Sequence, residues 1–188
     1  MAYLFNDFKG WKAYCEEHKL KLYEAVLEYE VKQKGKKEED IFINLGKAYD
    51  VMREAIQTGL TEDMSSRSGM VNNGAKKVAQ NKISVLSPEF QKLIARALAA
   101  KEVNSCMGRV VAAPTAGASG ILPGTLFTLQ EIHNLDDRII HEGLLLAAGI
   151  ALIIEQKASL AGAVGGCQAE NGGRCHRLCL RRHRRSNI

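Results

Sequence analysis

The sequence predicts an all-α fold, and three observations support this class. Apolar residues recur at intervals of three and four along most of the chain. Residues typical of helix ends, such as the Ser87-Pro88 pair, stand before several of these stretches. No segment of useful length alternates apolar and polar residues as a half-exposed strand does. The 188 residues, 46% of them hydrophobic, are enough for one domain with a buried core.

Three helices are predicted in the first third of the chain. The first begins after Asn6 or Asp7, either of which can cap it. The second spans residues 20–33 and ends near Gly35, a residue type common at helix ends. The third stops at Gly59, and its apolar face has residues spaced by four and three: Ile41, Leu45, Ala48, Met52 and Ala55.

Two polar or small-residue loops interrupt the middle of the chain. Residues 61–77 are dominated by Ser, Asn and Gly and therefore predict a loop. A helix capped by Ser87 is predicted to continue to about Met107. Residues 111–124, VAAPTAGASGILPG, predict the second loop.

Two further helices are predicted before a third loop. One covers residues 125–132, and the other runs from Asp137 to Lys157 after the capping residue Asp136. Its apolar run, residues 144–154, is shorter than a membrane span and suits a buried helix. The N-terminus has no secretory signal, so we expect a cytoplasmic protein without a membrane partner. The polar, glycine-rich loops are expected to converge on one cluster or substrate site.

The composition changes abruptly at Arg174. The tail from there on holds six of the 26 Lys and Arg residues, whereas all 21 acidic residues precede it. We therefore expect one domain over residues 1–172 and a basic tail, residues 173–188, that is disordered or not native to the fold. Basicity confined to one end is a weak sign of nucleic-acid binding, and we expect no nucleic-acid partner. A zinc knuckle is the alternative for the tail, although its spacing matches no common template: Cys167, Cys175, Cys179 and His183.

Three sets of residues are candidates for chemistry. Cys167 lies among glycines. Its side chain is either a metal-bound or reactive thiolate or a buried structural thiol, and the sequence does not decide between them. Residues 114–120, PTAGASG, can present backbone N–H groups to an anion, helped by Thr115 and Ser119; a tight helix connection is the alternative. His133, His141 and Glu142 form either an acid–base group or the solvated start of a helix.

Three loops in order carry a family resemblance. They are SRSGMVNNGAKK (residues 66–77), VVAAPTAGASGILPGTLF (residues 110–127) and ASLAGAVGGCQAENG (residues 158–172). With them, residues 1–172 resemble the α subunit of the bacterial iron–sulfur-dependent L-serine dehydratases. The resemblance implies a lyase of serine catabolism and gluconeogenesis, an L-serine ammonia-lyase that forms pyruvate and ammonia.

The resemblance also implies a cofactor, a partner and a set of site residues. A [4Fe-4S] cluster held by three cysteines keeps one iron open as a Lewis acid for the serine hydroxyl, and Cys167 matches the first of these cysteines. Thr115, Ala116 and Gly117 are expected to bind the substrate L-serine, with Ser68 and Asn73 as a second lining. The partner is a β subunit, and the catalytic base is not assignable from this chain.

Two departures from the family pattern stand out. The family usually has an acidic residue where this chain has Gly74. Beyond residue 172 the family continues with a small-residue helix and two more cluster cysteines, which the present tail lacks. We therefore expect a C-terminal truncation or a change of reading frame near Gly172 or Gly173, with little or no dehydratase activity from these 188 residues. The alternative is a non-catalytic helical remnant or partner that docks a β subunit.

Overall fold

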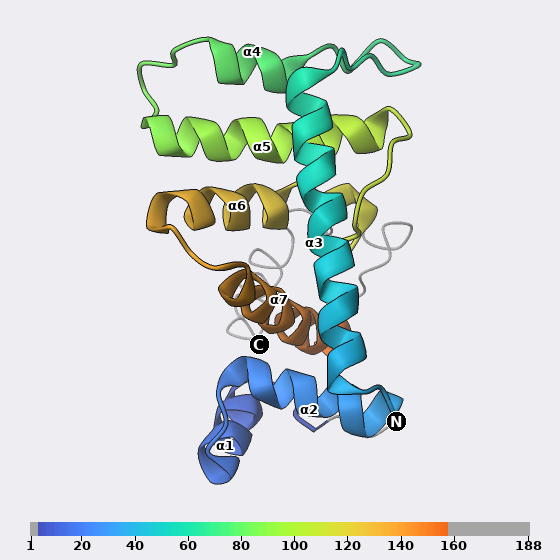
Figure 1. Ribbon diagram of the computed structural model, residues 1–188, viewed down its shortest axis with the longest axis vertical. Helices are drawn as coiled ribbons and strands as arrows, with labels where there is room; N and C mark the ends of the chain where they lie inside the picture. Colours follow the sequence, from blue (N-terminus) through green and yellow to red (C-terminus); the bar gives the residue numbers. More distant parts are fainter. Residues whose placement is uncertain (1–3, 158–188) are drawn as a thin grey trace, which may run out of the picture.

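The computed structural model describes residues 4–157, which form seven α helices and one short 3-10 turn without a strand (Figure 1). The all-α prediction is confirmed. The elements are α1 (Phe8–His18), α2 (Leu22–Lys34), α3 (Glu38–Thr61), α4 (Gly74–Gln80), α5 (Pro88–Ser105), η1 (Ala116–Ala118), α6 (Ile121–His133) and α7 (Asp137–Lys157).

Several helix boundaries follow the residues that the sequence indicated. The Asp7 carboxylate accepts a hydrogen bond from the Gly10 N–H at 2.7 Å and caps α1. The Ser87 hydroxyl accepts one from the Phe90 N–H at 3.2 Å, with Pro88 as the first residue of α5. Gly35 ends α2 in the left-handed conformation, with φ of 63°. These local signals succeed because each satisfies a backbone group that the helix itself leaves unpaired.

Two predicted boundaries were wrong. The loop predicted for residues 61–77 ends at Asn73, because α4 begins at Gly74. Helix α6 begins at Ile121 rather than at residue 125. Pro123 lies within its first turn, where the missing N–H of proline breaks no intrahelical hydrogen bond.

Helix α3 joins the separate parts of the core. It runs along the front of the molecule and crosses α5 and α6 (Figure 1). The core has three clusters of buried side chains, and α3 contributes to each of them: Ile41 to the first, Ala55 and Ile56 to the second, and Tyr49 and Met52 to the third. The first cluster also holds Trp11 and Val26 from α1 and α2 with Ile153 from α7.

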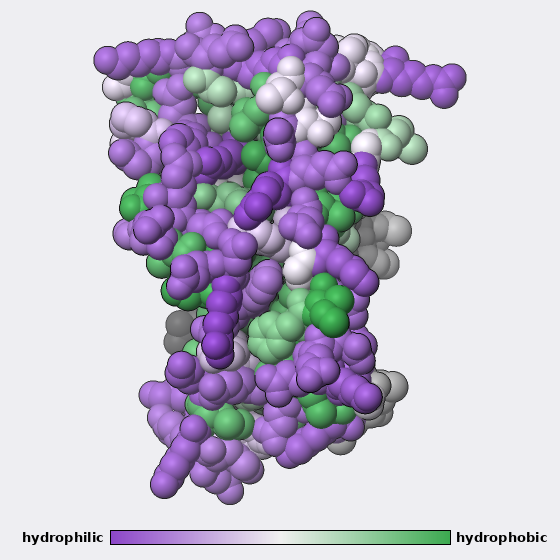
Figure 2. All heavy atoms as spheres, in the orientation of Figure 1, coloured by the Kyte–Doolittle hydropathy of each residue, from purple (hydrophilic) through white to green (hydrophobic). Residues whose placement is uncertain are grey.

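Helix α7 is long and apolar enough to cross a membrane by length and composition, the one such helix within residues 4–157. The core helix of a soluble protein passes the same test. Here α7 packs against α2, where a side chain at Gly149 would overlap the Val26 and Trp11 side chains. The face shown in Figure 2 is largely hydrophilic, with apolar side chains in small separate patches.

Glycines bring the backbones of α3, α5 and α6 into direct contact. A Cβ atom at Gly59 of α3 would lie 2.6 Å from Ala99 Cα of α5. A Cβ at Gly124 of α6 would lie 2.8 Å from the Ala97 nitrogen, and Gly120 approaches the Ala97 carbonyl. Because these neighbours are backbone atoms, they cannot yield as a flexible side chain can. The second cluster and the start of α6 therefore depend on glycine at these positions.

We predict opposite effects from two alanine substitutions in α3. Gly59→Ala is expected to lower the free energy of unfolding by about 1–3 kcal/mol, since it overpacks the contact with Ala99. Gly46→Ala, the matched control, meets no atom within 4 Å and should raise the free energy of unfolding by up to about 1 kcal/mol. Urea denaturation measures both, and equal effects would contradict the close approach of α3 and α5.

Candidate functional site

The loop that contains Thr115, Ala116 and Gly117 is held by the last turn of α5. The Lys101 ammonium donates a hydrogen bond to the Gly117 carbonyl at 3.1 Å. The Asn104 side-chain amide donates to the Ala116 carbonyl at 3.0 Å. Both carbonyls belong to η1, which directly precedes α6. The three residues predicted to bind substrate thus form one turn that two side chains of α5 hold in place.

Two hydroxyls of this loop are buried without a hydrogen-bond partner. Within residues 4–157, neither Thr115 Oγ1 nor Ser119 Oγ has one, and Ser119 is only 2% exposed. A buried hydroxyl without a partner costs about 1–3 kcal/mol. The loop also leads into the N-terminus of α6, where unpaired N–H groups and the helix dipole favour an anion. These N–H groups and the two hydroxyls are the polar groups that this loop can offer to a ligand.

The second predicted lining, Ser68 and Asn73, belongs to the loop between α3 and α4. Asn73 closes the neck of this loop, because its Oδ1 accepts a hydrogen bond from the Met64 N–H at 2.6 Å and its own N–H donates to the Met64 carbonyl at 3.1 Å. Asn73 has a left-handed backbone with φ of 54°. Ser68 is exposed, and its hydroxyl lies 3.2 Å from the Ser66 hydroxyl.

Glu102 attaches this second loop to the same turn of α5. Its carboxylate accepts hydrogen bonds from the Gly74 N–H at 2.7 Å and the Ala75 N–H at 3.2 Å. Successive residues of a helix are 100° apart, so Glu102 and the pair Lys101 and Asn104 project from different sides of α5. Figure 1 shows α4 and α6 on opposite sides of α5. The structure brings Thr115, Ala116 and Gly117 together, and it holds Ser68 and Asn73 on the other side of the helix end.

The predicted metal ligand Cys167 lies outside the described residues, as do the tail and the third loop. Residues 4–157 contain no group of three His, Cys, Asp or Glu side chains that could hold a metal ion. Cys15 is buried in the first core cluster, and Cys106 is half-buried beside the second; both are free thiols. This part of the chain does not by itself fit an iron–sulfur cluster.

Sequence reasoning missed a polar network between α3 and α7. The Tyr49 hydroxyl donates to Asp137 Oδ1 at 2.8 Å and accepts a hydrogen bond from Arg53. His141 packs edge-on against the Tyr49 ring, with centroids 5.5 Å apart, and its Nε2 is buried. The His141 ring is therefore not fully solvated, as the solvated helix start among the two alternatives required. Tyr49 continues the spacing of the apolar face of α3, which is the signal that could have identified it.

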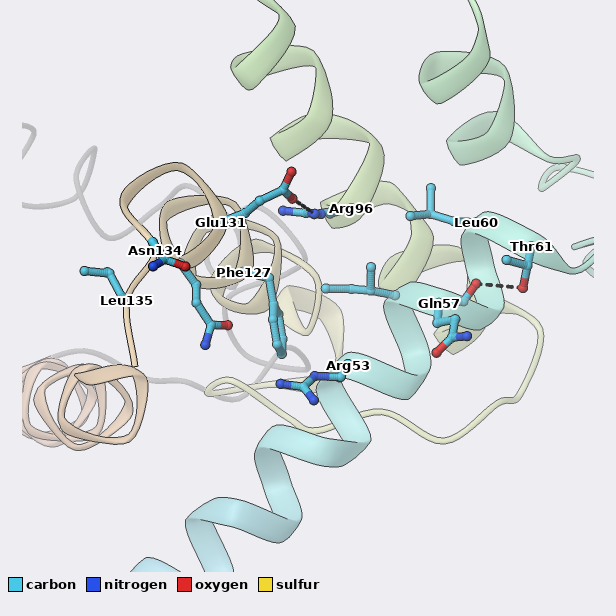
Figure 3. Close-up of a pocket in the computed structure, with 11 residues that line it drawn as sticks. Arg53, Gln57, Leu60, Thr61, Arg96, Phe127, Glu131, Asn134 and Leu135 are labelled. Carbon is cyan, nitrogen blue, oxygen red and sulfur yellow. Dashed lines mark hydrogen bonds and ion pairs between the residues drawn. The ribbon is translucent and has the colours of Figure 1, made fainter. Parts of the chain in front are cut away.

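A groove of about 550 Å³ lies between α3, α5 and α6 (Figure 3). Its apolar lining includes Leu60 and Phe127, and Arg53 lines it from α3. The Arg96 guanidinium is paired with Glu131 within it. A second groove, of about 610 Å³, shares Leu60 and Arg96 and continues beside the α4–α5 connection. None of the residues predicted to bind substrate lines either groove.

The Tyr49 network predicts a pH dependence. Hydrogen bonds from Tyr49 and Gln130, with Arg53 nearby, lower the pKa of Asp137. A carboxyl group whose pKa is lower in the folded state than in the unfolded state, about 3.9, stabilises the fold at any pH above the unfolded pKa. This stabilisation is lost as the pH falls through the folded-state pKa. Tyr49→Phe is expected to raise the pKa of Asp137, as followed by NMR of its carboxyl carbon. Asp63, whose pKa is lowered by Lys76 instead, serves as the control in the same spectrum and should not move.

Three relatives are similar to this chain over most of its length. The L-serine dehydratase alpha chain of Peptoniphilus asaccharolyticus is 39% identical over 161 residues, covering 84% of this chain and 55% of the relative. The "Probable L-serine dehydratase, alpha chain" of Bacillus subtilis is 32% identical over 172 residues, covering 90% and 57%. The L-serine dehydratase of Haemophilus influenzae is 34% identical over 183 residues, covering 93% and 40%.

The chain spans about half the length of these relatives. No solved structure matches it. A family model described as "Serine dehydratase alpha chain" matches residues 17–175, a range that includes both loops held by α5 and also Cys167. The chain therefore belongs to the serine dehydratase alpha chain family.

Proposed function

We propose that this chain is the alpha-chain part of a cytoplasmic L-serine ammonia-lyase, which converts L-serine to pyruvate and ammonia in serine catabolism and gluconeogenesis. The observation that supports it most is the loop of residues 114–120, in which two buried hydroxyls that find no partner among the described residues precede the N-terminus of α6. This loop lies within the range that the family model matches. The names of the relatives support the reaction class.

The chemistry of the loop suits the groups of L-serine. The substrate has a carboxylate, whose oxygens can accept hydrogen bonds from the N–H groups at the start of η1 and α6. Its hydroxyl can pair with Thr115 Oγ1 or Ser119 Oγ, and so can a carboxylate oxygen. The reaction removes the α-proton and the hydroxyl group and leaves an enamine, which tautomerises and hydrolyses to pyruvate and ammonia. A loop fixed by Lys101 and Asn104 would hold the reacting carbons in one orientation.

We propose Cys167 as one ligand of a [4Fe-4S] cluster, since thiolates are the usual ligands of such clusters. The support is the GGCQAE segment around Cys167. Residues 4–157 offer no group of three metal-binding side chains, and the resemblance assigns the other two ligands to cysteines that the present tail lacks. The alpha-chain names of two relatives support an enzyme with more than one subunit, and we propose a β subunit as the partner.

L-serine binding tests the proposed function directly. We expect saturable changes in the amide NMR signals of Ala116 and Gly117 with L-serine, and weaker changes with L-alanine, which lacks the hydroxyl. Thr115→Val should weaken L-serine binding about tenfold, which corresponds to about 1.4 kcal/mol. The same change should leave the stability equal or higher, because it removes a buried hydroxyl that has no hydrogen-bond partner in the described part of the chain.

Thr125→Val is the matched control for this experiment. Thr125 lies on α6, where its hydroxyl donates a hydrogen bond to the Ile121 carbonyl. Thr125→Val should therefore leave L-serine binding unchanged. Absence of any saturable response to L-serine in the unaltered chain would refute the proposed function. Equal binding by Thr115→Val would remove Thr115 from the site.

The cluster proposal has its own test. After anaerobic reconstitution with iron and sulfide in the presence of the β subunit, Cys167→Ser is expected to hold less iron and sulfide than the unaltered chain. Cys106→Ser, which changes a half-buried thiol beside the second core cluster, should leave both unchanged. Chemical analysis of iron and acid-labile sulfide gives the comparison, and equal losses in both variants would exclude a specific role for Cys167.

A further inference from the structure

We propose that Lys101 selects a carboxylate as the ligand of the candidate site, because its ammonium lies beside the loop of residues 114–120. This inference rests on the proposed function, in which the carboxylate is that of L-serine. The Lys101 ammonium donates a hydrogen bond to the Gly117 carbonyl at 3.1 Å. An ammonium has three N–H donors and a full positive charge. Within residues 4–157 this bond uses one donor, so two donors and the charge are available to a ligand.

Lys101 differs from the other half-buried cations of the fold because it has no acidic partner. Among the Lys and Arg residues whose side chains the structure describes, three are half-buried: Lys76, Arg96 and Lys101. Lys76 pairs with Asp63 at 2.8 Å, and Arg96 pairs with Glu131. The bond to the loop carbonyl is the one polar contact of the Lys101 ammonium in the described part of the chain. A charge that is withdrawn from water needs a partner, and Lys101 therefore favours an anion beside it.

Holding the loop does not by itself require a charge. Asn104, in the same turn of α5, donates to the neighbouring Ala116 carbonyl at 3.0 Å with a neutral amide. A neutral donor is therefore sufficient to hold a carbonyl of η1. The positive charge of Lys101 points to a second task, which is to attract a negatively charged ligand.

The surroundings of the ammonium suit the same kind of ligand. Lys101 follows Ala97 by one helical turn, and Gly120 lies against the Ala97 carbonyl, so this face of α5 packs on the start of α6. Ser119 directly precedes Gly120, is 2% exposed, and has a hydroxyl without a hydrogen-bond partner within residues 4–157. The N-terminus of α6 also favours a negative charge. A carboxylate can accept hydrogen bonds from the ammonium, from the hydroxyl and from the backbone N–H groups.

The test measures how the full chain distinguishes L-serine from L-serinamide, which keeps the amine and the hydroxyl but has a neutral amide in place of the carboxylate. In the unaltered chain, the Kd for L-serinamide should be at least about tenfold that for L-serine. Lys101→Gln removes the charge and keeps an N–H donor for the Gly117 carbonyl. It should raise the Kd for L-serine about tenfold and change the Kd for L-serinamide by less than about twofold.

Three further variants complete the comparison. Lys101→Arg keeps the positive charge, so the Kd for L-serine should rise by no more than about threefold. Lys92→Gln is the matched control, because it removes a charge of the same helix that is paired with Glu131, and it should leave both Kd values unchanged. Lys101→Met, which is also neutral, carries the test if Lys101→Gln does not fold.

A residue that only held the loop would affect both ligands alike, since a displaced loop is displaced for each of them. The same equal effect would follow if a protein carboxylate were the partner of Lys101. An equal change of both Kd values in Lys101→Gln, an unchanged Kd for L-serine, or equal affinity of the unaltered chain for the two ligands would each refute the role of Lys101. No response to L-serine in the unaltered chain would instead refute the proposed function, and the inference with it.

Discussion

The close contact of α5 with α3 and α6 is the constraint on which the rest of the structure depends. Gly59 and Gly124 bring the two neighbouring helices against the backbone of α5 at Ala99 and Ala97. The backbones are so close that no side chain fits between them. The packing of the three helices therefore depends on the positions of their backbones. As a result, α3 and α6 fix the C-terminal end of α5 from two sides. Both candidate loops are attached to that end.

The attachment of both candidate loops to α5 explains how loop residues can form the candidate site. Residues on loops are placed accurately only where a rigid element supports them. Here Lys101, Glu102 and Asn104 of one helical turn provide the support: Lys101 and Asn104 bond to backbone carbonyls of η1, and Glu102 bonds to backbone N–H groups at the start of α4. Lys101 and Asn104 bind the loop with Thr115 through its carbonyls, and within residues 4–157 the Thr115 and Ser119 hydroxyls have no hydrogen-bond partner. The contacts that hold this loop on α5 thus use its carbonyls, and its hydroxyls are separate from those contacts.

Local signals in the sequence predicted most of the fold. Asp7 and Ser87 cap their helices as expected, because a cap depends only on residues within one turn. Helix α4 escaped prediction because its start is stabilised by Glu102, a residue far along the chain. Glu102 itself follows the buried Ala95 and Ala99 at helical spacing, and a charge at a core position is a signal that could have revealed it. No local pattern shows that the two loops lie on different sides of α5, since that depends on how α4 and α6 pack.

The first core cluster places the beginning of the described chain against its end. Gln156 of α7 donates a hydrogen bond to the Phe5 carbonyl, across 151 residues of sequence, and Ile153 packs in the cluster of Trp11 and Val26. A ribosome adds about 5–20 residues each second, so α1 and α2 wait on the order of ten seconds for α7 to be made. During that interval their apolar faces are without their final cover.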